Sequence, residues 1–259
     1  IGSKNSTFCP LFQYLLMGII LWKEGYIKKF IIYRYCRNAF LRLILYRNNN
    51  DVHLSIMQRP KEDIKKHIQI TAQELFLQKG YQKASMREIA EKSGVGLGNI
   101  YNYYANKDEL FRTIVSPVIA AFEKMLQNHH GNHGEDVMNM CSETYFRETF
   151  NEYMSLMKKF HSLLEILLFR AQGSSLEHFR IDYTERSTEI VKVWFADVKS
   201  KYPALNTSVS DFFIHLHGVW MFVLFEELIM HHIQLPDMET IISEYIQFEI
   251  QGWRYIIKI

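Results

Sequence analysis

Apolar side chains recur at helical spacing in the segment that follows Glu62. The positions are Ile64, Ile68, Ala72, Leu75 and Phe76. Because three to four residues make a helical turn, positions with this spacing share one face and form a buried stripe. Gly80 follows the stripe, as glycine commonly does just beyond a helix C-terminus. We therefore predict a first helix that ends at Gly80.

Two further short helices are predicted around a glycine turn. Ser85-Met86-Arg87-Glu88 has the spacing of a capping box, in which the serine and glutamate oxygens accept hydrogen bonds from free N–H groups at a helix start. This helix should run to about Ser93, and Gly94 can then turn left-handed without steric cost. A second helix from about Leu97 to Tyr104 follows. Two short helices joined by a tight turn indicate a helix-turn-helix over residues 85 to 107.

Every segment beyond Asn106 has a helical pattern, and none alternates as a strand would. The predicted fold class is therefore all-α, with a small three-helix domain that carries the helix-turn-helix and a larger helical domain. Breaks are expected at Pro117, at His129 to Gly134, at Gly173 to Ser175, at Pro203 and near Pro236. The further helices are predicted near residues 107–128, 136–160, 162–171, 176–200, 208–232 and 237–258.

Residues 1–56 lack this order, because their apolar runs show neither a 3.6-residue nor a two-residue period. The run Leu11 to Trp22 is shorter than the ~20 residues that span a bilayer, and no small-residue cleavage site follows it. Clear helical patterning starts only after Met57. We therefore expect Met57 to be the natural first residue and residues 1–56 to be a non-native or upstream-translated leader. The alternative is a basic amphipathic segment that lies on a membrane surface.

Charge divides the chain at the same places. Residues 1–56 carry a net charge of +6, residues 57–106 of +3 and residues 107–259 of −7. A basic unit followed by an acidic one is typical of a nucleic-acid reader joined to a body that DNA repels. We therefore expect a DNA-binding domain over residues 57–106 and a second functional domain over residues 107–259.

The cysteine content favours a reducing compartment. The chain has three cysteines, Cys9, Cys36 and Cys141, an odd number at spacings that match neither a disulfide framework nor a zinc knuckle. Aromatic side chains are abundant, with 18 Phe, 15 Tyr and 4 Trp, and most of these rings have to be buried. We expect a cytoplasmic protein with a large aromatic core.

Glycines, apolar pairs and tyrosines recur at fixed spacing through the predicted helix-turn-helix. The positions are Phe76, Gly80-Tyr81, Ala84-Ser85, Ile89-Ala90, Gly94-Val95, Gly98 to Tyr104 and Lys107 to Leu110. This pattern resembles the TetR family, which has Gly-Tyr or Gly-Phe, Ile-Ala, Gly-Val, a Gly-x-(Leu/Ile)-Tyr-x-(Tyr/His)-Phe stretch and Lys-(Glu/Asp)-x-Leu. The resemblance implies a bacterial, homodimeric transcription regulator, and it does not extend into the C-terminal half.

The second of the two short helices has one face rich in hydroxyl and amide groups. Ile100 and Tyr104 lie one turn apart and are expected in the core. Tyrosine hydroxyls can hydrogen-bond phosphates, whereas asparagine can pair with adenine in the major groove. The resemblance implies that phosphates are held by Tyr101, Tyr103 and Lys107. It places near bases or backbone Ser85, Arg87, Leu97, Asn99 and Asn102.

Two positions in this helix qualify that assignment. Gly98 costs about 1 kcal/mol against alanine inside a helix, which fits a backbone that approaches DNA closely. The family often has Lys, Arg or Gln at the position of Leu97, so this departure leaves contact with a thymine methyl as the available means of reading a base there. The alternative for the whole helix is that its aromatic side chains pack a small three-helix core.

The last two predicted helices are apolar on two faces, which indicates burial on two sides. In TetR-type proteins these helices pair with their copies in a four-helix interface, so the resemblance implies a homodimer. The residues expected in the dimer interface are Trp220, Glu227, Tyr245, Gly252, Trp253 and Ile256.

Aromatic side chains of the middle helices suit either a plain core or a pocket for a small, largely apolar effector. The resemblance favours a pocket, because the family keeps its ligand among these helices. The residues expected to line it are Phe146, Phe150, Tyr153, Phe169, Phe179, Tyr183, Trp194 and His215.

Catalytic and metal-binding patterns are absent from the sequence. There is no nucleophile elbow, phosphate-binding loop or HExxH motif. His129, His130 and His133 occupy a glycine-rich loop and His231-His232 ends a helix, but no carboxylate or cysteine stands at tight ligand spacing. We interpret them as helix-end histidines and expect no enzyme, no cofactor and no metal.

These observations lead to one principal hypothesis and two alternatives. The principal one is a DNA-binding transcriptional repressor that binds a palindromic operator as a homodimer and is released by a small apolar effector. The first alternative is a TetR-like DNA-binding protein without a small-molecule ligand, controlled by a protein partner. The second is a membrane-surface interaction protein that acts through residues 1–56, although a membrane partner is not expected.

Overall fold

The computed structural model describes residues 29–36, 39–48, 51–57, 61–131 and 134–259 of the chain. Two compact units are present: one comprises Ile1–Ile68 with Arg87–Tyr103, the other Gln69–Met86 with Tyr104–Ile259. The run Leu11 to Trp22 lies outside the described residues. The expected domain boundaries after residues 56 and 106, and the interpretation of residues 1–56 as a leader, remain predictions.

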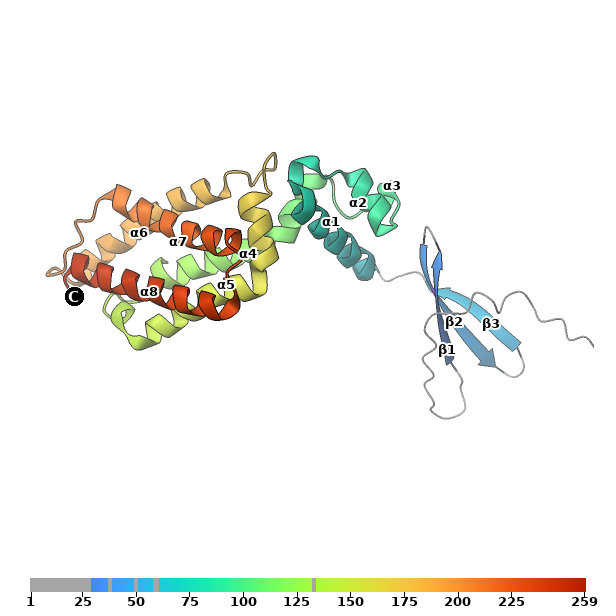
Figure 1. The fold of residues 1–259 in the computed structure, drawn as a ribbon, viewed down its shortest axis with the longest axis horizontal. Helices are drawn as coiled ribbons and strands as arrows, with labels where there is room; N and C mark the ends of the chain where they lie inside the picture. The colour runs from blue at the N-terminus through green and yellow to red at the C-terminus, as the bar shows by residue number, and fades with distance from the viewer. Residues whose placement is uncertain (1–28, 37–38, 49–50, 58–60, 132–133) are drawn as a thin grey trace, which may run out of the picture. The chain divides into compact units, whose positions relative to one another are not determined.

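A three-stranded antiparallel sheet precedes the helices (Figure 1). Its strands are β1 (Lys29–Cys36), β2 (Ala39–Asn48) and β3 (Asp51–Met57), arranged in the order β1-β2-β3. The lack of a two-residue period in residues 1–56 gave no indication of strands, yet the structure has three strands between residues 29 and 57. Isoleucine, tyrosine and phenylalanine favour strands even where apolar runs hide the alternation.

The remaining described residues, 61–131 and 134–259, are helical, which confirms the predicted fold class for that part of the chain. The first helix, α1 (Lys61–Lys83), is interrupted at Gly80, whose φ of 79° is left-handed. The predicted end of the first helix is therefore correct as a change in backbone conformation, although one further turn follows it.

Helices α2 (Met86–Ser93) and α3 (Leu97–Ile100) form the predicted helix-turn-helix. Gly94 lies between them with a φ of 63°, and the amide of Val95 donates to the carbonyl of Ala90 at 3.1 Å. A left-handed residue at this position costs glycine nothing, whereas a side chain would be strained there. The turn therefore depends on Gly94.

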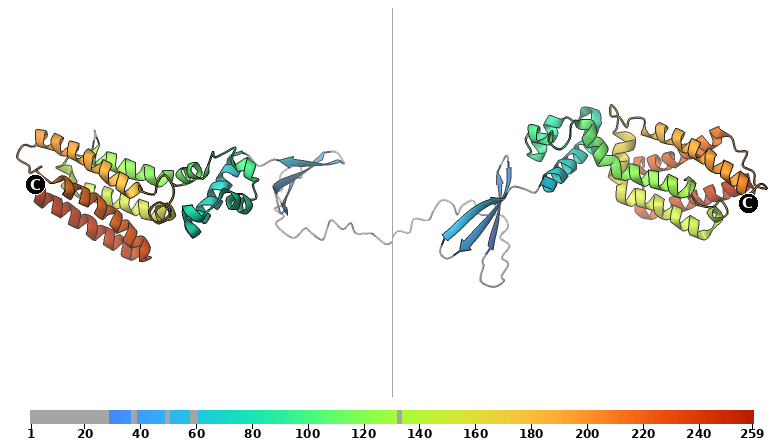
Figure 2. Two further views of the ribbon diagram at one scale, coloured as in Figure 1. Left: turned by 90° about the horizontal axis from the view of Figure 1, so that it is seen from above. Right: turned by 180° about the vertical axis from the view of Figure 1, so that it is seen from behind.

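Five longer helices make the helical body (Figures 1 and 2). A short 3-10 turn, Asn139–Cys141, precedes the second of them. In chain order they are α4 (Lys107–His130), α5 (Glu143–Phe169), α6 (Phe179–Lys201), α7 (Asp211–Met230) and α8 (Leu235–Ile257).

Two predicted breaks in the body do not occur. Helix α4 continues through Pro117, which cannot supply the N–H that the carbonyl of Thr113 would otherwise receive; the hydroxyl of Ser116 donates to that carbonyl at 2.9 Å instead. The break predicted near residue 161 is also absent, because α5 is a single helix with neither glycine nor proline inside it.

The core of the body is aromatic and joins α4, α6 and α7. The ring of Phe122 is fully buried. Its neighbours, at centroid distances of 5.2–6.0 Å, are Phe179, Tyr183, Phe222 and Phe225. Burial of such rings is the main favourable term in the packing of these helices.

Helix α7 is the one helix within the described residues that is long and apolar enough to cross a membrane by length and composition. Its most apolar window has a mean hydropathy of 1.5, and 33% of that window is buried. A core helix has the same composition, so this is weak support for a membrane span. Two large apolar side chains of α7, Phe212 and Val223, remain exposed in the single chain.

Candidate nucleic-acid interface and internal cavity

The surface of α3 and the turn after it is polar and open. Asn99 and Asn102 are exposed, and the side-chain amide of Asn102 donates to Oδ1 of Asn99 at 3.3 Å. Tyr101 is 48% exposed. Ile100 is fully buried on the opposite side, as predicted. The helix therefore presents amide and hydroxyl groups outward from a buried anchor, an arrangement suited to phosphates and base edges.

Two other predicted contact residues in this unit are positioned differently. Leu97 and Tyr103 are half-buried, and the ammonium of Lys61 lies 5.8 Å from the centroid of the Tyr103 ring. Arg87, at the start of α2, is exposed. Part of the Leu97 side chain is therefore exposed to solvent. The ring of Tyr103 lies beside the ammonium group of Lys61.

Gly98 has no packing partner that requires a glycine. A Cβ atom added at this position would meet nothing within 4 Å, and the backbone does not have a positive φ. Neither internal crowding nor conformation explains the residue. Open space around Gly98 leaves room for an external surface to approach the backbone here.

Lys107, predicted to hold a phosphate, is engaged within the protein. Its Nζ donates to the carbonyl oxygens of Tyr81 at 2.9 Å and Ala84 at 3.0 Å, and lies 4.0 Å from the centroid of the Tyr81 ring. Desolvation by burial lowers its pKa. Two of its three N–H donors are thus used at the end of α1. Tyr104 is buried, as expected, and Ser85 is exposed.

The loop between α5 and α6 is bonded to the ends of both α1 and α4. The amide of Tyr81 donates to the carbonyl of Arg170 at 2.8 Å. The amide and hydroxyl of Ser175 donate to the two carboxylate oxygens of Asp108 at 2.8 and 2.7 Å. Burial alone would raise the pKa of Asp108, but the hydrogen bonds from Ser175 and the charge of Arg112 outweigh it and lower the pKa. These hydrogen bonds connect the position of the loop to the ends of α1 and α4.

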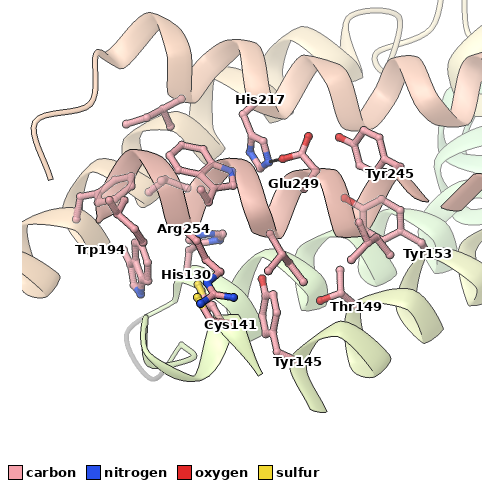
Figure 3. A pocket seen from close by; sticks show the side chains of 18 residues that line it. His130, Cys141, Tyr145, Thr149, Tyr153, Trp194, His217, Tyr245, Glu249 and Arg254 are labelled. Carbon is pink, nitrogen blue, oxygen red and sulfur yellow. Dashed lines mark ion pairs between the residues drawn. The ribbon is translucent and has the colours of Figure 1, made fainter. Parts of the chain in front are cut away.

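An internal cavity lies between the helices of the body (Figure 3). It has two lobes of about 120 and 110 Å³. Both lobes are lined by Tyr145, Thr149 and Tyr153, which lie one turn apart on α5, and by His217 of α7. Helix α8 contributes Glu249 to the first lobe. Shared lining residues show that the lobes are neighbours.

The structure brings three of the eight predicted pocket residues to this cavity. Trp194 lines the first lobe, Tyr183 the second and Tyr153 both. The other five do not line either lobe. The rings of Phe146 and Phe150 stack on each other, Phe169 is exposed, and Phe179 belongs to the aromatic core. His215 lies two residues before His217 on α7. Aromatic content alone could not separate core positions from cavity positions.

Two residues predicted for the dimer interface also face the cavity. Tyr245 and Trp253 line the first lobe, and the Trp253 ring lies 5.1 Å from that of His217. Ile256 packs against a buried cluster within the same chain. These three side chains therefore use at least part of their surface within the chain, because α8 has two apolar faces and the sequence does not say which one turns inward; their place in a dimer interface stays a prediction.

The other three predicted interface residues have surfaces that remain accessible. Trp220 is half-buried, and its ring contacts that of Phe213. Glu227 is exposed and pairs with His231 at 3.0 Å. A Cβ atom added to Gly252 would meet nothing within 4 Å. These positions stay compatible with a dimer interface, which no contact in a single chain can test.

Polar groups without partners are concentrated in the first lobe. Nε2 of His217 lies 2.5 Å from Oε2 of Glu249, the ion pair drawn in Figure 3. The other carboxylate oxygen of Glu249, the hydroxyl of Tyr245 and the hydroxyl of Thr149 are buried without a hydrogen bond of acceptable geometry. Leaving such groups unsatisfied costs about 1–3 kcal/mol each. The sequence pattern does not reveal this role, because Glu249 stands among largely apolar neighbours in α8.

Five histidines of the body make ion pairs or ring contacts: His129, His130, His215, His217 and His231. Burial lowers the pKa of His130 to about 3, so the residue is neutral at physiological pH. His129 lies 2.5 Å from a carboxylate oxygen of Glu152. Among the described residues, no group of three or more His, Cys, Asp or Glu is arranged to hold a metal ion.

An exposed polar helix-turn-helix and a helical body with an internal cavity are the architecture of a helical transcription regulator. The sequence profile of the family described as bacterial regulatory proteins, tetR family, matches residues 70–114. A helix-turn-helix-type transcriptional regulator from Staphylococcus aureus strain USA300 is 18% identical over 176 residues, covering 55% of this chain and 95% of the relative.

Solved structures with the same fold are also transcription regulators. NalD, the secondary repressor of the MexAB-OprM multidrug efflux pump in Pseudomonas aeruginosa, has a TM-score of 0.53 at 18% identity, with 74% of this chain and 95% of NalD covered. FadR from Bacillus subtilis, solved in complex with stearoyl-CoA, has a TM-score of 0.50 at 16% identity, covering 72% and 98%. The predicted resemblance to the TetR family is therefore confirmed over residues 70–114, and the relatives named above are transcription regulators rather than enzymes.

Proposed function

We propose that the protein is a homodimeric transcriptional repressor that binds a palindromic operator in the cytoplasm and is released when a small, largely apolar effector enters the cavity. The observation that carries this proposal is the combination of an outward polar face on α3 with a partly open, largely apolar cavity in the body of the same chain. A DNA reader needs the first feature, and control by a small molecule needs the second.

Dimerisation through α7 and α8 is supported by apolar surface that one chain does not cover. Phe248 and Tyr255 are 67% and 87% exposed on α8 and lie seven residues apart, with Gly252 between them on the same face. Helix α7 adds Phe212 and Val223, which are also exposed. Large exposed apolar patches mark interaction sites in water, and a glycine lets a second helix approach closely.

Release by a ligand requires a path from the cavity to the helix-turn-helix. The α5–α6 loop supplies one candidate, because α5 and α6 line the cavity and the loop between them is bonded to Tyr81 and Asp108. A ligand that shifts α5 against α6 would pull the ends of α1 and α4. This cavity favours the effector hypothesis over control by a protein partner alone.

The test of DNA binding is selection of bound DNA from random sequence, followed by measurement of point variants. We expect an inverted repeat with recognition helices set roughly 34–36 Å apart, as successive major-groove faces require. Asn102→Ala should relax base choice at one operator position with a penalty of about 1–3 kcal/mol for the preferred base. Tyr101→Phe should instead weaken binding to all sequences, because a phosphate contact carries no base information.

Recovery of no enriched sequence, or of enriched sequences that both variants bind as tightly as the unaltered protein does, would contradict the assignment of α3 as the reader. Glu91→Gln, on the exposed side of α2, is the matched control and should leave base choice unchanged.

A further inference from the structure

We propose that the cavity accepts an aromatic or otherwise apolar compound that carries a protonated nitrogen, and that Glu249 is the counter-ion of that nitrogen. The inference rests on the proposed role of the cavity as the effector site and adds the chemical class of the ligand. It follows from the charge, the rings and the size of the first lobe.

The carboxylate of Glu249 is positioned to bind a further donor. Its side chain is 12% exposed, Oε2 is paired with Nε2 of His217, and Oε1 is buried without a partner. A buried carboxylate oxygen left unsatisfied destabilises the empty state of the cavity. An N–H group of a cationic ligand, placed against Oε1, removes that cost and adds a charge-assisted hydrogen bond.

Aromatic rings surround this carboxylate. Tyr145, Tyr153, Tyr245 and Trp253 all line the lobe that contains Glu249 (Figure 3). Burial raises the pKa of each of the three tyrosines, so their hydroxyls stay neutral and keep their protons. Neutral rings attract a cation through their negative faces, and the effect grows when the cation is desolvated. The lobe thus favours a positive group beyond the single ion pair.

The other charged groups around the lobe do not reverse this preference. His130 is neutral because burial lowers its pKa to about 3. Arg254 lines the same lobe beside Cys141 and could pair with an anion, whereas His217, the other cationic group there, is already paired with Glu249. Arg254 is only partly buried, so water stabilises its charge, whereas Oε1 of Glu249 is buried and accepts no hydrogen bond of acceptable geometry from the described residues. A ligand therefore gains more binding free energy from a hydrogen bond to Glu249 than from pairing with Arg254.

The size of the cavity limits the apolar part of the ligand. Lobes of about 120 and 110 Å³ suit about one aromatic ring each, and a two-ring compound only if it extends from one lobe into the other, because an apolar protein cavity of ~150 Å³ holds benzene. The hydroxyls of Thr149 and Tyr245 are two further unpartnered polar groups that can bind a second polar atom of the ligand.

The experiment compares three naphthalenes of equal size: 2-naphthylmethylamine, 2-naphthalenemethanol and 2-naphthoate. Binding to the full chain is measured by isothermal titration calorimetry and by quenching of tryptophan fluorescence, since Trp194 and Trp253 line the lobe. We expect the amine to bind at least about ten-fold more tightly than the alcohol, and the naphthoate to bind most weakly.

Variants test the assignment to Glu249. Glu249→Gln should keep the alcohol affinity while removing the advantage of the amine, because the amide has the same shape without the charge. Glu244→Gln, an exposed residue on the same helix, is the matched control and should change nothing. Thermal unfolding of each variant tests whether the body remains folded.

Tighter binding of 2-naphthoate than of the amine, lost in Arg254→Gln, would overturn the proposal in favour of an anionic ligand. An amine advantage that persists in Glu249→Gln would overturn the role of that residue. Release of operator DNA is measured separately with the same compounds. Binding of the amine without release of DNA would refute the effector function while leaving the proposed ligand class intact. Release of DNA by naphthoate alone would support the effector function and refute the proposed ligand class.

Discussion

The helix-turn-helix and the cavity present their chemistry in opposite directions. The candidate DNA-contacting side chains on α3 and its following turn lie within seven consecutive residues and point outward from the buried Ile100. The cavity is assembled from residues between Met125 and Ile257, which come from α4, α5, α6, α7 and α8 and point inward. A DNA-contacting surface can be encoded by one short segment of sequence, whereas an internal ligand site requires the correct packing of all the helices of the body.

The difference also appears in what each region leaves unsatisfied. Polar groups on α3 are open to water, so the empty interface costs little. In the cavity, Oε1 of Glu249 and the hydroxyls of Thr149 and Tyr245 are buried without partners. Ligand binding therefore has more to gain in the cavity from a precise chemical match, while DNA binding gains from charge and shape spread along the surface.

The largest expected effect concerns the surface that joins two readers. Phe248→Glu places a charge on the exposed face of α8 and should give monomers, with operator affinity lowered by about 100-fold or more because two linked half-sites are lost. Light scattering and DNA titration measure the two effects. Gln247→Glu, exposed on another face of α8, is the control. A dimer that persists in Phe248→Glu would place the interface elsewhere.

The second effect separates a structural from a DNA-contacting role of Lys107. Lys107→Met keeps the aliphatic stem but leaves the carbonyls of Tyr81 and Ala84 without their donor, so unfolding free energy should fall by about 1–3 kcal/mol. Urea unfolding in the absence of DNA measures this. If stability is unchanged while the salt dependence of DNA binding falls by about one counterion per half-site, Lys107 is a phosphate contact instead.

A third test uses two glycines with different reasons to be small. Gly94→Ala should cost about 1–2 kcal/mol in stability, because the residue has a left-handed φ of 63°. Gly98→Ala should leave stability unchanged or raise it by up to about 1 kcal/mol, while weakening operator binding. Thermal unfolding and DNA titration on both variants separate the two roles. Equal DNA affinity of Gly98→Ala and the unaltered protein would show that no backbone approaches there.

The smallest expected effect is a pH-dependent one at the α5–α6 loop. The pKa of Asp108 is lowered in the folded protein, so its contribution to stability is present above the ordinary carboxyl pKa of about 3.9 and is lost as pH falls through the lowered value. Asp108→Asn should therefore be less stable than the unaltered protein at pH 7, and the difference should shrink towards pH 3.

Urea unfolding at both pH values measures this difference, with the exposed Asp197→Asn as the control. In the same variant, the loop is held less firmly, so the effector should release DNA less completely although each ligand binds alone as before. A stability difference that is the same at both pH values would exclude the charge of Asp108 as its cause.

How far sequence reasoning could reach depended on the range of the interactions. The reader was predictable because Gly80, Gly94, Ile100 and Tyr104 act through local backbone conformation and one-turn spacing, which are readable along the chain. The breaks predicted at Pro117 and near residue 161 failed. Ser116 compensates the first through a hydrogen bond within the helix, and packing of α5 along its length overrides the weak signal for the second.

The sequence by itself determined the helical class of the body, the helix-turn-helix with its glycine turn, and the outward polar face of α3, because each follows from the spacing of neighbouring residues. Only the tertiary structure decided which face of α8 turns inward. It placed Tyr245 and Trp253, both expected in a dimer interface, in the lining of the cavity, and it placed His217 there rather than His215. It also left one carboxylate oxygen of Glu249 buried without a hydrogen bond of acceptable geometry. The physical reason is that a helix with two apolar faces gains similar free energy from burying either one, and the choice depends on the shapes of all the helices that pack against it.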